Sequence, residues 1–319
     1  MERIAVAYND DLARKPHLND IERLGEEEVI ATAEEIAQIV GATLVPVRDD
    51  VGGALQALRR FDVVVNLCEG VLGKPAFEPH FALGLEMLGI AHTGCDPIAT
   101  GICIDKILTK RLLAAAGIRV PNGRDSAASP DARWIVKPSR EDAGIGIDAA
   151  SVVSGERALE ERIAFVERTY RQPALVEAFI DGRELNQAIY LGRALPPGEI
   201  VFDDALAPHE RVVGWKAKWA AGSNEDRATR NVTPAPLDGA TAQRVAELCL
   251  RAANVLGIDM YARFDLRMAA DGELYLLDVN PNPDIGAGSG FRRALDAAGV
   301  PFADFLHALI MAAGARRRR

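Results

Sequence analysis

Short apolar runs alternate with amphipathic stretches from the start of the chain. Residues 4–8, 43–47 and 61–67 are typical of buried strands, whereas residues 21–40 carry apolar positions at helical spacing. Strands that alternate with helices predict a parallel sheet with helices on its faces. We expect this α/β domain to span residues 1–95.

A small α+β lobe is predicted next, over residues 96–183. Asp96 suits the N-cap of a helix and Pro97 its first position, and the helical pattern ends at Gly117. The remaining elements expected in this lobe are a strand at 134–137, a helix at 156–170, and a hairpin formed by strands 174–180 and 184–190.

The C-terminal lobe is expected over residues 184–319. A helix is predicted at 240–256 and two strands at 261–268 and 273–280. A polar loop covers residues 209–231. Loops of this length within a compact domain often act as lids or binding elements.

Composition limits the function classes. Of the 319 residues, 49% are hydrophobic and 26% charged, which is typical of a globular protein. No apolar run approaches the roughly 20 residues that cross a bilayer, and the N-terminus lacks the pattern of a signal peptide. We therefore expect a cytoplasmic protein without a membrane partner. The net charge of −9 argues against nucleic acid as a partner.

Cysteines and the basic C-terminus carry little functional signal. No pair among the four cysteines has the CxxC spacing of a zinc or redox site, so they are expected to be reduced core residues. The run Arg316–Arg319 is interpreted as a solvated tail.

A second hairpin near the C-terminus is the most informative segment. Asp271-Gly272 is a turn signal between two apolar runs. If Met268 pairs with Glu273, Asp265 lies opposite Leu276. A loop of three or five residues would break this alignment.

This register would bring oxygen donors onto one face of the sheet. Asp265, Asp278 and Asn280 would lie there together with Arg263. Two carboxylates and an amide oxygen suit Mg²⁺ that takes its other ligands from phosphates. The alternative is that these are polar residues at a solvated strand end.

Two lysines are candidates for phosphate contacts. Lys137 ends an apolar strand and precedes the small, flexible run Asp-Ala-Gly-Ile-Gly, whose N–H groups could cradle phosphates. Lys106 lies on the preceding predicted helix. Taken alone, both lysines could equally be surface charges.

Glu177 and Glu184 flank a turn that could hold a nucleoside. An adenine ring needs backbone donors and acceptors between apolar walls, and a ribose diol needs a carboxylate. The strand before Asp181-Gly182 and Glu184 after it could supply both. An ordinary amphipathic hairpin is the alternative.

Taken together, these segments resemble the ATP-grasp superfamily and, within it, the D-alanine–D-alanine ligases. The resemblance runs over nearly the whole chain. It is strongest over residues 88–120, 136–147, 175–185, 216–219 and 262–283. It implies an ATP-grasp fold preceded by the N-terminal parallel-sheet lobe.

The resemblance also implies roles for individual residues. Lys106 and Lys137 match the lysines that contact ATP phosphates, and Lys218 matches a loop lysine that reaches the terminal phosphate. The other matches are Glu177 with the backbone near Phe179 and Ile180 for the adenine hinge, Glu184 for ribose, Asp265, Asp278 and Asn280 for magnesium, Arg263 for the oxyanion, Glu26 for the first substrate's ammonium group and Ser289 for the second substrate's carboxylate.

Departures from the family pattern concern the substrate. The signature His-Gly-x-x-Gly-Glu-Asp-Gly is replaced by residues 69–76 (EGVLGKPA), and the Gly-Ser-Ser-Val-Gly loop by residues 142–146 (DAGIG). Trp219 replaces a tyrosine and cannot donate a hydroxyl hydrogen bond. Glu69 and Asp284 stand where the family has histidine and glycine, and we expect them to bind a cationic amine. A salt bridge to a nearby arginine is the alternative.

The expected activity is an ATP- and Mg²⁺-dependent carboxylate–amine ligase that acts through an acyl phosphate, with Mn²⁺ as a substitute cation. Its expected substrates are a small carboxylate and an amine other than the D-alanine pair. A genuine D-alanine–D-alanine ligase and a nucleotide-binding protein without ligase turnover are the alternatives. By analogy with the family, a homodimer is expected.

Overall fold

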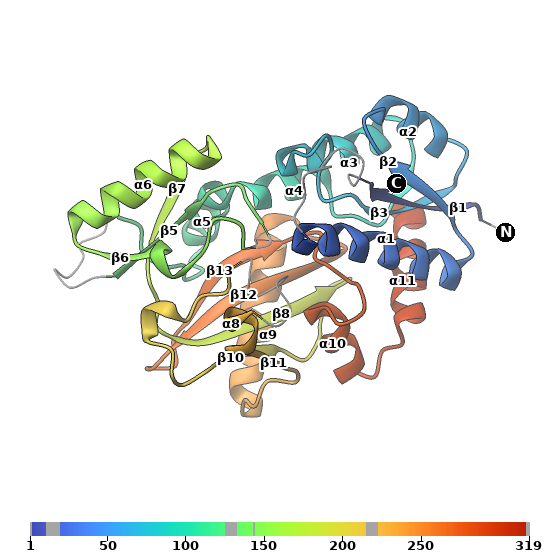
Figure 1. Ribbon diagram of the computed structural model, residues 1–319. Helices are drawn as coiled ribbons and strands as arrows, with labels where there is room; N and C mark the ends of the chain where they lie inside the picture. Colours follow the sequence, from blue (N-terminus) through green and yellow to red (C-terminus); the bar gives the residue numbers. More distant parts are fainter. Residues whose placement is uncertain (1, 11–19, 125–132, 143, 215–222, 317–319) are drawn as a thin grey trace.

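The computed structural model describes residues 2–10, 20–124, 133–142, 144–214 and 223–316, with only the backbone described at 20–26, 225 and 226. Three sheets follow one another along the chain and form three lobes (Figure 1). One sheet lies within each predicted segment, except that the third begins at Gly182, two residues before the expected boundary.

The N-terminal lobe contains a four-stranded parallel sheet, in the order β2-β1-β3-β4. Every residue of β3 is buried, because helices cover both faces of the sheet and leave no solvated side. The predicted parallel α/β arrangement is confirmed. The elements are β1 (Ile4–Asn9), α1 (Asp20–Val40), β2 (Thr43–Val47), α2 (Val51–Leu58), β3 (Val63–Leu67), a 3₁₀ turn (Pro75–Phe77), α3 (Glu78–Met87) and β4 (Ala91–His92).

The central lobe is a three-stranded antiparallel sheet, in the order β6-β5-β7, which is covered by one helix. Its small core contains Trp134, Val136, Leu159 and Val166. The elements are β5 (Arg133–Pro138), a 3₁₀ turn (Ala149–Ser151), β6 (Val152–Ser154), α6 (Glu156–Tyr170) and β7 (Ala174–Ala178).

The C-terminal lobe is built on an antiparallel sheet with the strand order β11-β10-β8-β12-β13, and β9 pairs with β8. Its strands are β8 (Gly182–Tyr190), β9 (Arg193–Ala194), β10 (Gly198–Phe202), β11 (Thr229–Val232), β12 (Tyr261–Ala269) and β13 (Leu274–Asn280). Its helical segments are a 3₁₀ turn (Pro208–Glu210), α8 (Asn224–Arg227), α9 (Gly239–Leu256), α10 (Gly290–Ala297) and α11 (Phe302–Arg316).

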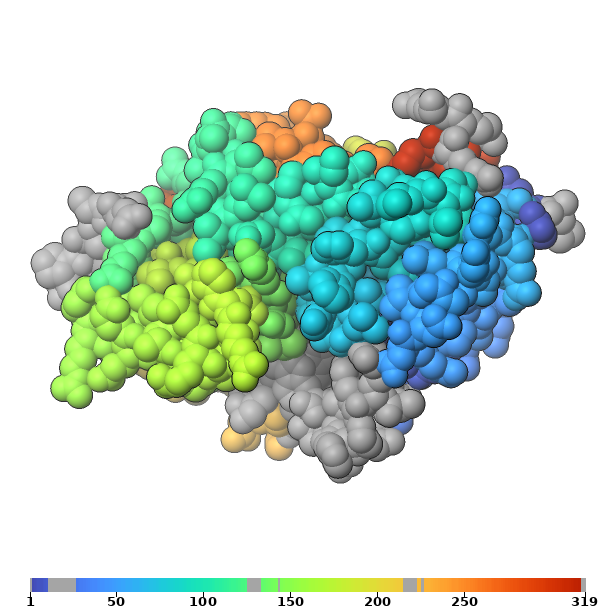
Figure 2. Space-filling view, turned by 90° about the horizontal axis from the view of Figure 1, so that it is seen from above, coloured from blue at the N-terminus to red at the C-terminus, as the bar shows by residue number. Residues whose placement is uncertain are grey.

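Helices α4 (Pro97–Ile104) and α5 (Lys106–Ala115) connect the lobes. They pack with α9 and β13, and their apolar residues belong to the core of the C-terminal lobe. In Figure 2 this teal segment lies between the blue N-terminal lobe and the green central lobe. The single helix predicted up to Gly117 is interrupted at Asp105, whose side chain caps α5 by accepting a bond from the Leu108 N–H.

Two predictions about local structure are wrong. Strands β7 and β8 do not form a hairpin, because β7 pairs with β5 in the central sheet and β8 pairs with β10 and β12 in the C-terminal sheet. The chain crosses between lobes at residues 179–181. The predicted loop 209–231 is also not wholly irregular, since α8 lies within it and β11 pairs with β10 at its end.

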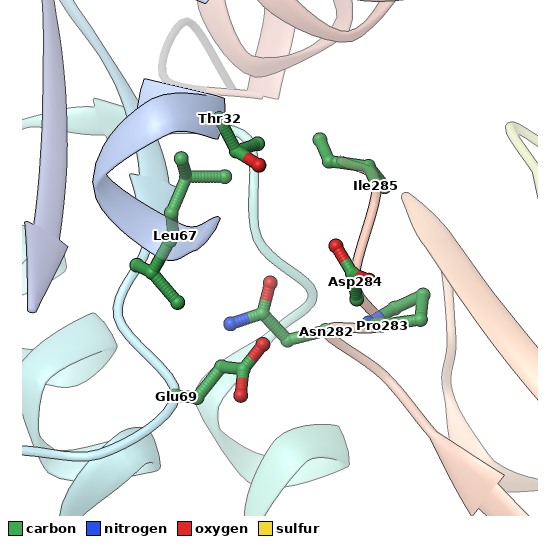
Figure 3. A pocket seen from close by; sticks show the side chains of 8 residues that line it. Thr32, Leu67, Glu69, Asn282, Pro283, Asp284 and Ile285 are labelled. Atoms are coloured by element: carbon green, nitrogen blue, oxygen red, sulfur yellow. The ribbon is translucent and has the colours of Figure 1, made fainter. Parts of the chain in front are cut away.

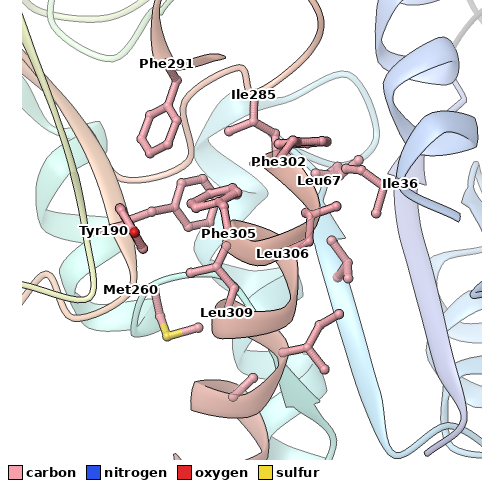
Figure 4. Close-up of a cluster of buried hydrophobic side chains, with 14 of the residues drawn as sticks. Ile36, Leu67, Tyr190, Met260, Ile285, Phe291, Phe302, Phe305, Leu306 and Leu309 are labelled. Carbon is pink, nitrogen blue, oxygen red and sulfur yellow. The ribbon is translucent and has the colours of Figure 1, made fainter. Parts of the chain in front are cut away.

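The C-terminal helix α11 joins the first and third lobes. It contacts α1, β3 and β4, and its Phe305 lies among four aromatic rings (Figure 4). Arg316 does not belong to a solvated tail, because it donates to the Gly94 carbonyl oxygen and pairs with Asp259 at 2.8 Å. Residues 317–319 lie outside the described part.

All four cysteines are free and buried, as predicted. None of the helices in the described ranges is by itself long and apolar enough to cross a membrane. Only α10 and α11 taken together, with a bend of 104° between them, meet that test of length and composition.

Replacing Phe305 with alanine should lower the free energy of unfolding by about 3–5 kcal/mol, because the ring is fully buried and its removal leaves a cavity at the junction of two lobes. Urea denaturation measures this change. Met311→Ala, on the same helix but with 74% of its surface exposed, is the control and should change stability by less than ~0.5 kcal/mol. Equal effects of the two substitutions would contradict this account of the core.

Candidate active site

A cavity of about 550 Å³ lies between the central and C-terminal sheets and is also lined by residues of the N-terminal lobe. Every predicted site residue whose side chain is described lines it. These residues are Glu69, Lys106, Lys137, Glu177, Phe179, Ile180, Glu184, Arg263, Asp265, Asp278, Asn280, Asp284 and Ser289. The side chain of Glu26 and the whole of Lys218 lie outside the described residues, as does Trp219.

The oxygen donors reach the floor of the cavity by a register that differs from the predicted one. Met268 pairs with Leu274 rather than Glu273, so the turn is longer than predicted. That shift alone would turn Asp265 and Asp278 to opposite faces of the sheet. A bulge after Asp265 leaves Leu277 without a partner in β12 and restores the alternation.

As a result, Asp265 lies opposite Asp278, not Leu276, and Arg263 lies opposite Asn280. All four side chains share one face of the sheet, as the sequence led us to expect. The same face continues onto β8, where Asn186 pairs with Asp265 and also lines the cavity.

The two carboxylates are compensated by neighbouring cations. Arg263 donates to both oxygens of Asp265, at 2.9 and 3.0 Å, and Lys106 Nζ lies 3.0 Å from Asp278 and 2.9 Å from Asp142. Burial acts to raise the pKa of Asp278, but Lys106 and then Lys137 outweigh it and hold that pKa below its ordinary value. Asp278 is therefore ionised at neutral pH.

The donor set fits a hard divalent cation. Nowhere in the described ranges do three or more His, Cys, Asp or Glu side chains form a metal-binding group on their own. Two carboxylates and one amide oxygen therefore suit an ion that completes its shell with phosphate oxygens and water, as Mg²⁺ does. Asp265, Asp278 and Asn280 would hold it, and it would neutralise charge on the phosphates.

Glu177 lies on the wall opposite this floor. Its carboxylate is only 2% exposed and lies between two lysines, 3.0 Å from Lys137 Nζ and 2.6 Å from Lys110 Nζ. Burial acts to raise the pKa of Glu177, but the two lysines outweigh it and lower that pKa. Lys106 and Lys137, which were predicted together from the sequence, thus reach the same cavity from α5 and β5.

The interlobe crossing forms one end of the cavity. The N–H groups of Ala178 and Phe179 donate to the carbonyl oxygens of Asn122 and Arg133. Among the described residues, no hydrogen bond occupies the N–H of Ile180. Of the two predicted hinge residues, Ile180 is therefore the one with a backbone donor for an adenine ring.

Arg267 organises this end of the cavity. It is 3% exposed and donates from two nitrogens to one oxygen of Glu184, at 2.6 and 3.0 Å, which leaves the other oxygen as an acceptor for a ribose diol. Its guanidinium also lies 5.6 Å from the ring centre of Phe179 and donates to the Ile180 carbonyl oxygen.

At the opposite end, acids from two loops line the cavity. Glu69 follows β3, Asp284 follows β13, and both also line a smaller cavity of about 20 Å³ in which Asn282 lies between them (Figure 3). The small cavity has apolar walls made by Val29, Leu67, Pro283 and Ile285. Asn282 accepts a hydrogen bond from Tyr261 Oη at 2.7 Å, which fixes the loop that carries Asp284.

The structure adds cavity residues that the sequence reasoning missed. Glu28, on α1, lines the cavity, and burial and then Asp284 raise its pKa. Arg293 lies one turn after Ser289 on α10 and also lines the cavity. The spacing of Ser289 and Arg293 was the available signal, because residues four apart share a helix face.

The fold and the cavity together define an ATP-grasp protein. The D-alanine–D-alanine ligase of Bacillus anthracis in complex with ATP superimposes with a TM-score of 0.74 at 21% identity, covering 100% of this chain and 99% of that chain. The VanG D-Ala:D-Ser ligase of Enterococcus faecalis gives 0.72 at 18% identity, covering 98% and 99%. At these identities the similarity establishes the fold.

Sequence comparison establishes the family. The family described as the D-ala D-ala ligase C-terminus matches residues 132–311. The D-alanine–D-alanine ligase of Desulforudis audaxviator is 33% identical, covering 73% of this chain and 76% of that protein. The protein y4sG of Sinorhizobium fredii is 28% identical, covering 81% and 79%. The chain therefore belongs to the D-alanine–D-alanine ligase family. The expected enzyme class, an ATP-dependent ligase that forms a carbon–nitrogen bond, is confirmed by this membership.

Asp278→Asn should raise the Mg²⁺ concentration needed for half-maximal ATP binding by roughly 10-fold or more, because it removes a charged oxygen donor. Calorimetric titration of ATP at stepped Mg²⁺ concentrations measures this. Asp271→Asn, at the exposed turn of the same hairpin, is the control and should leave the Mg²⁺ dependence unchanged. An unchanged dependence in Asp278→Asn would refute the assignment of this face as the cation site.

Proposed function

We propose that this protein uses ATP and Mg²⁺ to activate a small carboxylate and to join it to an amine, and that its substrates differ from the D-alanine pair. The arrangement of charged residues in the cavity is the observation that supports this proposal. Lys106 from α5 and Lys137 from β5 line it together with Asp265, Asp278 and Asn280, and Lys106 lies 3.0 Å from Asp278. A triphosphate between them would meet positive charge from the lysines and cation ligands from the floor.

The first chemical step is attack of the substrate carboxylate on the γ-phosphate, which gives an acyl phosphate and ADP. Lys106 and Lys137 stabilise the negative charge on the phosphates. Lys218, which lies outside the described residues, is proposed to contact the terminal phosphate when the loop expected around it closes. Closure excludes water that would hydrolyse the acyl phosphate. Mn²⁺ is expected to replace Mg²⁺, since both accept oxygen ligands.

The second step is attack of the amine on the acyl carbon, with loss of phosphate. Arg263 would stabilise the oxyanion that forms. In the structure this guanidinium is fixed by its two bonds to Asp265, and the attraction of Asp265 raises its pKa further, so it stays charged at every accessible pH. Ser289 would hold the carboxylate of the second substrate.

Charge at the substrate end supports a cationic substrate group. Glu28, Glu69 and Asp284 line the same part of the cavity, and Glu26 is the further acid expected from the family pattern. Carboxylates that lie close together repel one another unless a cation joins them. We therefore infer that Glu69 and Asp284 bind the ammonium group of an amino acid or dipeptide substrate.

By analogy with the family, we expect this protein to be a cytoplasmic homodimer. Leu83, Met87 and Ile98 are exposed on α3 and α4, two helices that pack against each other. Such neighbouring apolar side chains suit a subunit contact.

Phosphate release from ATP, screened over pairs of carboxylates and amines, tests the proposed activity. Release should require both substrates, and mass spectrometry should identify a product joined by an amide bond. A product of two D-alanines would identify a D-alanine–D-alanine ligase instead. ATP binding without turnover for any pair would favour a nucleotide-binding protein that lacks ligase activity.

Arg263→Met should lower kcat by about 10²–10³-fold, since one donor to the oxyanion is lost, while ATP still binds. Steady-state kinetics and calorimetry separate the two effects. Arg230→Met, an exposed arginine on β11 of the same sheet, should retain wild-type kcat. If Arg263→Met turned over at the wild-type rate, Arg263 would not act in the chemical step.

Asp284→Asn should raise the KM for the amine-bearing substrate about 10-fold and leave the KM for ATP unchanged, because one charged partner of the ammonium group is lost. Asp296→Asn, exposed on α10, is the matched control. An unchanged KM for both substrates would mean that Asp284 does not bind the cation.

A further inference from the structure

Three charged groups are buried together behind the nucleotide end of the cavity. Glu177 directs one carboxylate oxygen to Lys110, at 2.6 Å, and the other to Lys137, at 3.0 Å. Each residue comes from a different element: Lys110 from α5, Lys137 from β5 and Glu177 from β7. All three are less than 9% exposed.

Lys110 differs from the other two in its position. Lys137 and Glu177 line the cavity, whereas Lys110 does not. Its Nζ atom also donates to the carbonyl oxygen of Leu276 in β13, at 2.9 Å, which fixes it on the side of Glu177 away from the cavity. Lys110 therefore reaches no ligand in the cavity directly and acts only through Glu177.

The balance of charge among Glu177, Lys110 and Lys137 indicates a function for Lys110. A buried carboxylate beside a single lysine would form a neutral pair, and that lysine would attract phosphate weakly. With Lys110 present, two positive charges share the one negative charge of Glu177, so one net positive charge remains within this group of three, and Asp278 on the floor attracts both lysines. Lys106, the other lysine among the described residues that line the cavity, is already paired with Asp142 and Asp278.

We propose that Lys110 is a positioning residue that neutralises Glu177 from behind, so that Lys137 keeps an uncompensated charge for the phosphates of the nucleotide. This inference rests on the proposed use of ATP and on Lys137 as a phosphate contact. It assigns a role in nucleotide affinity to a residue that lies outside the cavity.

The ionisation states agree with this arrangement. Burial lowers the pKa of Lys110 to about 8, while Glu177 acts in the opposite direction. Lys110 is thus still charged at pH 7, where the net charge of the three groups is positive.

Comparing the affinity for ATP with the affinity for adenosine is the sharpest test. Only ATP carries phosphates, and only phosphates are attracted by the charge of Lys137. Lys110→Met should raise the Kd for ATP on the order of 10-fold and leave the Kd for adenosine within about 2-fold. Calorimetry with each ligand, without carboxylate or amine substrates, measures both values. Arg111→Met, exposed on the same helix, removes an equal charge and should change neither.

Glu177 provides a second, independent comparison. Glu177→Gln removes the negative charge and should tighten ATP relative to adenosine, whereas Lys110→Met with Glu177→Gln should return the ratio to that of the wild type. The double variant also replaces a buried ion pair with neutral groups, which proteins tolerate better than a single unpaired charge. If Lys110→Met does not fold, the proposal is tested by comparing the affinity for ATP relative to adenosine between Glu177→Gln and the wild type.

Equal weakening of ATP and adenosine in Lys110→Met would overturn the proposal, since it would indicate a general loss of the pocket. The proposal would also be overturned if Glu177→Gln left the affinity for ATP relative to adenosine unchanged. Failure of the wild type to bind ATP would refute the proposed function itself. Wild-type binding with no effect of Lys110→Met would refute this inference alone.

Discussion

Side chains alternate between the two faces of a β-strand, and this alternation is the constraint on which the site depends. A hairpin gathers acids on one face only if the residues that pair across it keep the correct parity. The turn after Met268 changes that parity, and the bulge at Leu277 restores it before Asp265 and Asp278. Without the bulge, one of the two acids would face the apolar core beside Phe264 and Leu266.

Charge compensation then determines how the cavity can hold so many buried and half-buried ions. The floor pairs Asp265 with Arg263 and Asp278 with Lys106, and the opposite wall pairs Glu177 with Lys110 and Lys137. Ions removed from water are stable only with close partners of opposite sign. If a nucleotide and its cation bind here as proposed, they would exchange some of these partners for phosphate oxygens and metal.

The fold could be predicted because the sequence patterns that indicate its strands, helices and turns each span only a few residues. Parallel strands alternating with helices, the Asp271-Gly272 turn and the helix start at Asp96-Pro97 can be read within a few residues. The shared face of Asp265 and Asp278 was also predicted, although by a different register. A single sequence does not show a bulge, because the extra residue, Leu277, is an ordinary strand residue.

Other features depend on contacts between distant segments. The hairpin expected at 174–190 fails because β8 finds its partners in β10 and β12, which follow later in the chain. Lys110 and Arg267 resemble surface charges in the sequence. Only the fold, which brings Lys110 of α5 to Glu177 of β7 and Arg267 of β12 to Glu184 of β8, shows that each meets a carboxylate shielded from solvent.

The lobes differ in how they are joined, and this bears on how the enzyme can work. The N-terminal and C-terminal lobes share an apolar core through α11, so the substrate end of the cavity is built on packed side chains. The central lobe has its own small core and meets the others through the crossing at 179–181 and through ion pairs such as Lys106–Asp142 and Lys110–Glu177. Ion pairs reform with new partners more readily than a packed core rearranges. The central lobe is therefore the part that is freer to adjust to a ligand, while the acids proposed to bind the substrate lie on the packed lobes.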